Sequence, residues 1–335
     1  MGLKAKPKPI DAARDYLKAN PNISNKAAAR HLMKMHPGMW GTDNAAEVCV
    51  RRARGSQGAL SRSAIKDTAP KSKFTPGDWW LPPSIARDKP QILYPGAAKY
   101  LLLSDIHFPY QDNKALKAAL QCGEKEGCDS IYLNGDVLDF YALSDFDRDP
   151  GARSAWDEIK MVRKWLGSVK DRFKGRKIFK VGNHEARWER YLWAHAPDVS
   201  EVDDFALCSV LRLRDMGFDF IESKSVSYLG KLAVWHGHEL PRGLAPAVNP
   251  ARGVYMQLKE TAIVGHFHRS STHVEASGFQ KESVSCWSTG CLAGMWPNYA
   301  VINKWNQGWA IVDVDKSGGF TVTNYQMHKG HVYQL

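Results

Sequence analysis

Apolar and polar positions alternate in two different rhythms from Lys99 onward. The segments 113–127 (NKALKAALQCGEKEG) and 156–173 (WDEIKMVRKWLGSVKDRF) place apolar residues at helical spacing, whereas short runs such as YLLL and AIV have the continuous apolar character of buried strands. Strands that alternate with helices predict an α/β domain, which we place at residues 98–335.

The first third of the chain has a helical pattern only. Three short helices are expected after a basic tail at residues 1–9; Ser24 is placed to cap the second, and Thr42 or Asp43 the third. Together they predict a small helix-turn-helix-like domain at residues 10–57. The expected helices cover residues 11–20, 25–35 and 44–54.

Residues 58–97 have no periodicity and are rich in Pro, Ser and Lys, so they are predicted to be a linker. Trp79 and Trp80 interrupt it, and we expect them to pack on the neighbouring domain. No apolar run approaches the roughly 20 residues that a membrane helix needs, and no apolar signal core follows the first residues. We therefore expect a cytoplasmic protein without a membrane partner, and the sequence leaves its oligomeric state open.

The net charge of +11 is confined to one part of the 335 residues. Residues 1–100 hold 18 Lys and Arg against 7 Asp and Glu, whereas residues 101–335 hold 28 of each kind. Such asymmetry favours an acidic partner for the N-terminal part, with DNA or RNA as the first candidate. The third expected helix ends in Arg51, Arg52 and Arg54, which are candidates for contact with nucleic acid. Arginines that are merely solvated, or a protein partner, are the alternatives.

Five apolar runs of the α/β domain end directly in Asp, Asn or His. Ligands of open α/β sheets bind beyond the carboxyl ends of the strands, so these endings predict one shared site. The runs and their endings are KYLLL with Asp105 and His107, SIYLN with Asp136 and Asp139, KIFKV with Asn183 and His184, KLAVW with His236 and His238, and TAIV with His266 and His268.

Carboxylate, carboxamide and imidazole groups suit Mn²⁺, Fe, Zn²⁺ or Ni²⁺, and the absence of Cys from these endings argues against a structural zinc site. One Asp can bridge two ions about 3.5–4 Å apart, and such a pair polarises a phosphoryl group. We expect two divalent ions, with Mn²⁺ as the first choice.

The blocks D-x-H (105–107), G-D-x-x-D (135–139), G-N-H-E (182–185), H-G (236–237) and G-H-x-H (265–268) resemble, in this order, those of the calcineurin-like metallophosphoesterases. With flanking strands the resemblance covers about residues 98–335. It implies a four-layer α/β/β/α sandwich. It also implies that Asp105, His107, Asp136 and His268 hold one metal ion, and that Asp136, Asn183, His236 and His266 hold the other, so that Asp136 bridges them.

The resemblance further implies that His184 does not ligate but acts as a general acid toward the leaving oxygen or stabilises charge there. Glu185 either orients His184 or ends the turn. Asp139 either hydrogen-bonds a ligand or is a turn residue, and Arg187 either holds a phosphate oxygen or is a solvated helix-face arginine. His238 is expected beside the metal ligands rather than among them.

The motifs predict a phosphoester hydrolase but not its substrate. The overall layout looks like phosphoesterases of bacterial viruses, and the charge asymmetry favours a nuclease or phosphodiesterase acting on DNA or RNA. The alternative is a phosphomonoesterase or small-nucleotide phosphodiesterase, whose basic N-terminal domain would serve localisation only. A non-enzymatic nucleic-acid-binding protein is a third hypothesis, which the complete ligand set argues against.

Overall fold

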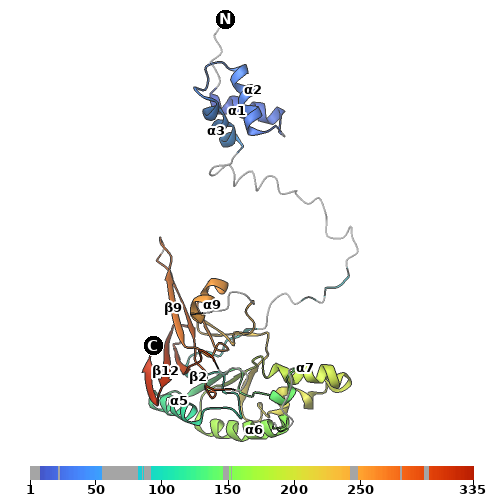
Figure 1. Ribbon diagram of the computed structural model, residues 1–335, viewed down its shortest axis with the longest axis vertical. Helices are drawn as coiled ribbons and strands as arrows, with labels where there is room; N and C mark the ends of the chain where they lie inside the picture. Colours follow the sequence, from blue (N-terminus) through green and yellow to red (C-terminus); the bar gives the residue numbers. More distant parts are fainter. Residues whose placement is uncertain are drawn as a thin grey trace. The chain divides into compact units, whose positions relative to one another are not determined.

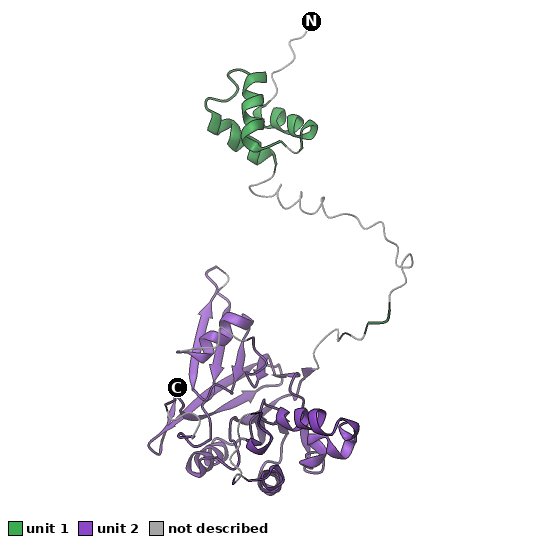
Figure 2. Cartoon of the chain, turned by 45° about the vertical axis from the view of Figure 1, so that its right-hand side comes forward, with its two compact units in different colours: residues 1–85 green, residues 86–335 purple. Residues whose placement is uncertain are grey.

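The computed structural model describes most of the chain and divides it into two compact units, residues 1–85 and 86–335, which we treat separately (Figure 2). The predicted linker at 58–97 lies largely outside the described residues, as do Trp79 and Trp80, so those expectations stay predictions. The described residues are 8–21, 23–54, 82–84, 86, 92–145, 151, 153–241, 248–279, 281–297 and 302–335.

The first unit contains the three expected helices. The side chain of Ser24 accepts a hydrogen bond from the backbone N–H of Ala27, and Thr42, rather than Asp43, caps the third helix by accepting from Ala45. Small side chains such as Ala13 allow the helices to approach closely around Leu32, which is fully buried. The helices are α1 (Pro9–Ala19), α2 (Asn25–Met35) and α3 (Asp43–Ala53).

The second unit is built on two mixed sheets. The seven-stranded sheet has the order β13 (His331–Gln334), β12 (Phe320–His328), β11 (Gln307–Val314), β2 (Ala98–Leu103), β3 (Ser130–Asn134), β4 (Lys177–Lys180) and β5 (Phe218–Ile221). The six-stranded sheet has the order β1 (Ile92–Leu93), β6 (Val226–Leu229), β7 (Leu232–Trp235), β8 (Ala262–Val264), β10 (Ser283–Ser288) and β9 (Ser271–Ala276).

Strand β2 shows why its apolar run is continuous. Successive side chains point to opposite faces of a strand, so both faces of β2 must be covered. Tyr100 and Leu102 pack against the six-stranded sheet, for example in a cluster with Val234, whereas Leu101 and Leu103 pack on the helices of the opposite face. Strands β2, β3, β4 and β5 pair in parallel, so their carboxyl ends lie along one edge.

Helices complete the outer layers and confirm the expected four-layer α/β/β/α architecture. Figure 1 shows α5 and α6 along the seven-stranded sheet, and α9, which contacts β8, β9 and β10, along the other. In the part of the chain that the structure describes, no helix has the length and apolar character needed to cross a membrane. The remaining elements are α5 (Asn113–Lys125), η1 (Tyr141–Leu143), α6 (Ala155–Arg172), α7 (Ala186–His195), η2 (Pro197–Val199), η3 (Asp203–Phe205), α8 (Leu207–Val210) and α9 (Pro250–Leu258).

Candidate metal centre

The five polar endings follow strands of both sheets. Strands β2, β3 and β4 of one sheet and β7 and β8 of the other deliver them, and parallel pairing within each sheet aligns the carboxyl ends. The predicted ligands come together in two groups of side chains whose ligand atoms lie within 4.8 Å of one another: Asp105, His107 and His268, and Asp136, His236 and His266.

The first group has three acceptor atoms that face one another. Asp105 Oδ1 lies 3.1 Å from Nε2 of His268, which is itself 3.2 Å from Nε2 of His107. Asp139 Oδ2, 2.9 Å from Nδ1 of His107, fixes the proton of that ring on Nδ1 and leaves the Nε2 lone pair directed into the group. The second oxygen of Asp105 accepts from Ser104 Oγ and the N–H of His266, whereas its buried Oδ1 accepts no hydrogen bond from the described residues.

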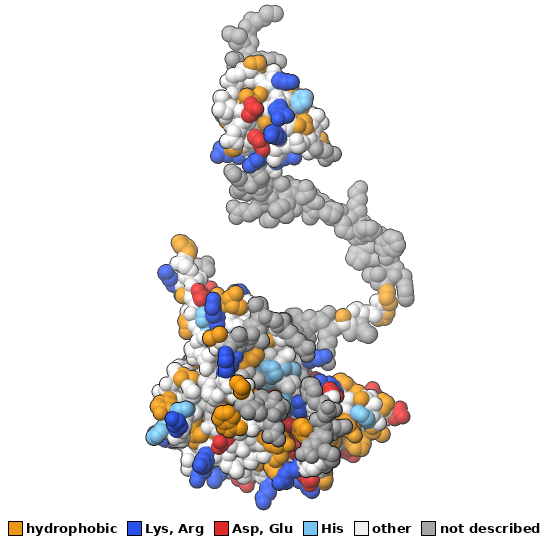
Figure 3. Space-filling view, in the orientation of Figure 1, with side chains coloured by type: hydrophobic (Ala, Val, Ile, Leu, Met, Phe, Trp, Pro, Cys, Tyr) orange, Lys and Arg blue, Asp and Glu red, His pale blue; other side chains and the backbone are white. Residues whose placement is uncertain are grey.

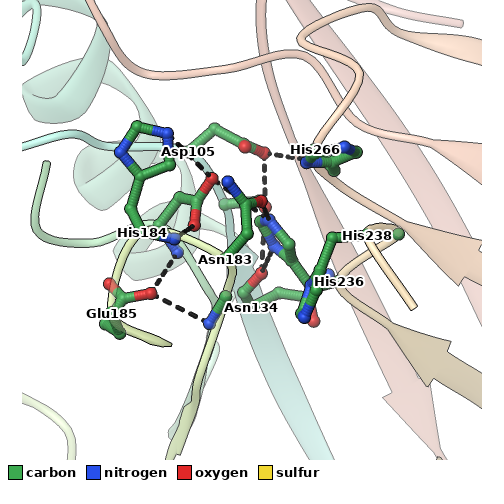
Figure 4. A network of polar contacts seen from close by, with 12 residues as sticks. Asp105, Asn134, Asn183, His184, Glu185, His236, His238 and His266 are labelled. Carbon is green, nitrogen blue, oxygen red and sulfur yellow. Dashed lines mark hydrogen bonds and ion pairs between the residues drawn. The ribbon is translucent and has the colours of Figure 1, made fainter. Parts of the chain in front are cut away.

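The second group is arranged in the same way (Figure 4). His236 Nδ1 lies 2.6 Å from the carbonyl oxygen of Asn134 and donates to it, so the Nε2 lone pair points inward. That Nε2 lies 3.2 Å from Oδ2 of Asp136 and 3.2 Å from Oδ1 of Asn183. The same Asp136 oxygen lies 3.9 Å from Nε2 of His107 in the first group. Asp136 therefore stands between the two groups, as a bridging carboxylate must.

Lone pairs that converge without a donor require a cation between them, and the pKa values show the same demand. Burial raises the pKa of Asp136, but the charges of His236 and His184 outweigh burial and hold it well below its usual range. Burial lowers the pKa of His236, but the carboxylate of Asp136 raises it to about 10. Without another cation the carboxylates retain a proton on the imidazole, so a divalent ion would displace protons from this site. The donor set fits divalent metal ions.

Backbone strain marks the same residues. Asp105, His107, Asp136, His266 and His268 have φ angles between 51° and 63°, in the left-handed region that residues with a Cβ rarely adopt. Such conformations cost of order 1–3 kcal/mol each and persist where the surrounding structure enforces them, which is typical of functional sites.

Two groups of Asp and His ligands joined by one aspartate, at the strand ends of a two-sheet sandwich, decide the identification. The fold and the ligand set are those of a calcineurin-like metallophosphoesterase.

Known proteins of similar sequence come from bacterial viruses. No family model matches the chain. The "Gene 54 protein" of Mycobacterium phage L5 is 25% identical over 230 residues, which cover 65% of this chain and 89% of the phage protein. The "Gene 54 protein" of Mycobacterium phage D29 is 23% identical over 229 residues, with the same coverage.

Solved structures that are similar have low sequence identity. Vacuolar Protein Sorting 29 from Cryptosporidium parvum is 12% identical with a TM-score of 0.40, and covers 72% of this chain and 96% of its own. A dimetal phosphatase from Danio rerio (10%, 0.39) covers 71% and 98%, and nuclease MPE from Pseudomonas putida (14%, 0.31) covers 64% and 84%. TM-scores this low carry no argument about activity, which rests on the metallophosphoesterase site itself.

Glycines permit the close packing of the metallophosphoesterase loops. A Cβ at Gly182 would overlap Oδ1 of Asp136 and lie 2.6 Å from its backbone nitrogen. A Cβ at Gly135, where φ is +82°, would lie 2.5 Å from Nδ1 of His236. Both positions therefore exclude any larger side chain without displacement of a predicted ligand.

Glu185 has neither of the two roles expected from the sequence. Its fully buried carboxylate accepts four backbone hydrogen bonds, from Gly182, Asp136, Val137 and Leu138. These bonds tie the G-N-H-E loop to the loop that carries Asp136. Glu185 thus fixes the backbone of the predicted bridging ligand.

The neighbours of the predicted ligands are placed around His184. Nδ1 of His184 donates to the carbonyl oxygen of Asp139 at 2.8 Å, and Arg187 Nη1 donates to the same oxygen at 2.9 Å. Burial lowers the pKa of His184 to about 4, although the charge of Asp136 opposes this. The hydrogen bond of Asp139 to His107 agrees with the first of its two expected roles, and Arg187 is held in place rather than solvated.

A cavity of about 490 Å³ adjoins the second ligand group. Asn183 and His266 line it from the metal side, and Arg187, Arg190 and Gln257 are on its other walls. Two guanidinium groups beside the predicted ligands are suited to phosphate oxygens.

A buried ion pair behind the site was missed in the sequence. Lys180, fully buried in β4, places Nζ 2.8 Å from Oε1 of Glu239, whose other oxygen accepts from the N–H of Gly237. The pair thereby holds the turn between His236 and His238. His238 itself lies 2.8 Å from Ser223 Oγ, beside the predicted ligands. A lysine inside a strand gave no signal of this role.

The three arginines of α3 lie in the first unit. Arg51 pairs with Glu47 at 2.7 Å, and Arg54 donates to the carbonyl oxygen of Ile23. Arg52 is exposed. Their contact with nucleic acid stays a prediction.

Proposed function

We propose that this protein is a dinuclear metal-dependent phosphoesterase that hydrolyses phosphodiester bonds of DNA or RNA. The observation that carries the proposal is the position of Asp136 Oδ2, which lies 3.2 Å from His236 Nε2 in one ligand group and 3.9 Å from His107 Nε2 in the other. One carboxylate at the junction of two cation-demanding groups is the requirement of a two-metal hydrolase.

The residues divide between the two ions as follows. Asp105, His107, Asp136 and His268 would hold one, and Asp136, Asn183, His236 and His266 the other, with Mn²⁺ as the expected metal. When bound, such a pair polarises the phosphoryl group and lowers the pKa of a water molecule.

The chain's own groups would position the ester and manage its proton. His184 is neutral at pH 7 with its proton on Nδ1, because burial lowers its pKa to about 4 and the carbonyl oxygen of Asp139 accepts from Nδ1. A bound phosphate raises the pKa of a neighbouring imidazole, so substrate binding favours a proton on Nε2. From there His184 can protonate the leaving oxygen, and Arg187, held by Asp139, can bind a non-transferred oxygen.

Support for a nucleic-acid substrate comes from charge. The excess of 11 positive charges lies in residues 1–100, and the cavity beside the second ligand group is lined by Arg187 and Arg190. A polynucleotide offers phosphates to both regions. Because proteins of similar sequence come from bacterial viruses, we place this activity in the cytoplasm of a bacterial host cell.

One observation favours the second candidate, a phosphomonoesterase or small-nucleotide phosphodiesterase. Residues 101–335 hold equal numbers of acidic and basic residues, so the catalytic unit alone has no general attraction for a polyanion.

A turnover test distinguishes the candidates. Metal-stripped protein is reloaded with Mn²⁺ and given bis-p-nitrophenyl phosphate, p-nitrophenyl phosphate, and single- and double-stranded DNA and RNA. The expected result is cleavage of the diester and of a polynucleotide, absent in Asp136→Asn. Preference for the monoester, with every nucleic acid uncut, would select the second candidate.

A further inference from the structure

Helix α2 carries a row of basic side chains that no described residue neutralises. Lys26, Arg30 and Lys34 stand four residues apart, so they lie on one face of the helix, opposite the buried Ala29 and Leu32. All three are exposed. With about 1.5 Å of rise per residue, the row spans about 12 Å. We call Lys26, Arg30 and Lys34 the α2 basic row.

The acidic residues of this unit are engaged elsewhere. Residues 8–54 contain nine Lys and Arg and four Asp and Glu, and α2 contains none of the four. Asp11 pairs with Arg14, Asp15 with Lys18, and Glu47 with Arg51, each within its own helix; the fourth acid, Asp43, lies in the first turn of α3.

The row is unfavourable for the isolated helix. Like charges four residues apart on a helix repel each other, and the row contains two such pairs, Lys26 with Arg30 and Arg30 with Lys34. The lack of a counter-charge means that the repulsion is relieved only by an external anion. Figure 3 shows Lys and Arg side chains on the face of this unit that is in view.

We propose that the α2 basic row is the surface through which the first unit binds the phosphate backbone of a nucleic acid. A regularly spaced row of cations matches a polymer with regularly spaced phosphates, and such contacts give affinity without reading sequence. The choice of partner rests on the proposed function. The row differs from the α3 arginines, of which Arg51 and Arg54 are already engaged inside the unit.

The test measures binding separately from cleavage. Full-length, metal-stripped protein is titrated onto labelled single-stranded and duplex DNA and RNA between about 50 and about 200 mM salt. The variant Lys26→Gln/Arg30→Gln/Lys34→Gln is compared with Arg14→Gln/Lys18→Gln/Arg51→Gln, which removes the same charge from residues that already have partners. Helical circular dichroism checks that both variants fold.

Each lost phosphate contact reduces the slope of log K against log salt by about 0.9 on duplex DNA and about 0.7 on single strands. We expect the row variant to lose about two to three units of slope and the control less than one. The charge-conserving variant Lys26→Arg/Arg30→Lys/Lys34→Arg should restore the wild-type slope. Equal losses in the two glutamine variants, or wild-type protein that binds no nucleic acid, would overturn the proposal. Because no metal is present, either result is independent of whether the catalytic unit cleaves diesters.

Discussion

Replacing Lys180 by Met should destabilise the catalytic unit more than any exposed lysine substitution. The change leaves the carboxylate of Glu239 buried without its cation, at 8% side-chain exposure. Burial raises the pKa of Glu239, but the charge of Lys180, followed by those of His238 and His236, lowers it to about 2. A depression from the ordinary 4.5 corresponds to about 3 kcal/mol of stability at pH 7. Removal of one partner from a buried pair typically costs about 3–5 kcal/mol, so we expect a loss in that range.

The assay is urea unfolding of metal-free, full-length protein, with Lys160→Met as the matched control. Lys160 has the same 2.8 Å separation from a carboxylate, Asp157, but both side chains are about half exposed, so no resolvable change is expected. The double variant Lys180→Met/Glu239→Gln should regain most of the lost stability, because an amide needs no counter-charge and its oxygen can still accept from Gly237.

The pH dependence has a definite sign. The folded pKa of Glu239 is depressed, so its contribution is complete above pH 4.5 and is lost as the pH falls toward about 2. The difference between wild type and Lys180→Met should therefore shrink over that range. A cost equal to that of Lys160→Met, or a double variant no more stable than Lys180→Met, would refute the reasoning.

Three further perturbations address the site directly. Asp136→Asn removes the bridging charge and should lower kcat by more than about a thousandfold with unchanged circular dichroism; near-normal turnover would mean that the metal assignment is wrong. Gly182→Ala places a Cβ against Asp136 and should weaken Mn²⁺ binding about 10- to 100-fold by calorimetry, whereas Gly167→Ala, in open space on α6, should leave it unchanged. Arg187→Ala should raise KM for a diester about tenfold or more, and an unchanged KM would remove this residue from substrate binding.

The layers of the fold and the location of the site could be predicted because they follow from local pattern. Apolar runs of strand length end in Asp, Asn or His, and parallel pairing of β2, β3 and β4 aligns those ends without any further information. Helix limits were equally local, since Ser24 and Thr42 cap the helices that follow them.

The supporting contacts could not be predicted because they join residues distant in sequence. Glu185 reads as the end of a turn, yet it binds backbone N–H groups of Asp136, Val137 and Leu138, 47 to 49 positions away. Lys180 reads as a polar position in a strand, and its partner Glu239 is identified only once β4 and the turn after β7 are in place. Neither pairing has a sequence period.

The central claim is that the two ligand groups share Asp136 and together hold two divalent ions. Its most direct test is the metal content of protein stripped, reloaded with Mn²⁺, desalted and measured by mass spectrometry, in parallel with Asp136→Asn. The account predicts about two ions per chain in the wild type and about one or fewer in the variant. A wild type that retains no metal, or an Asp136→Asn variant that retains as much as the wild type, would contradict it.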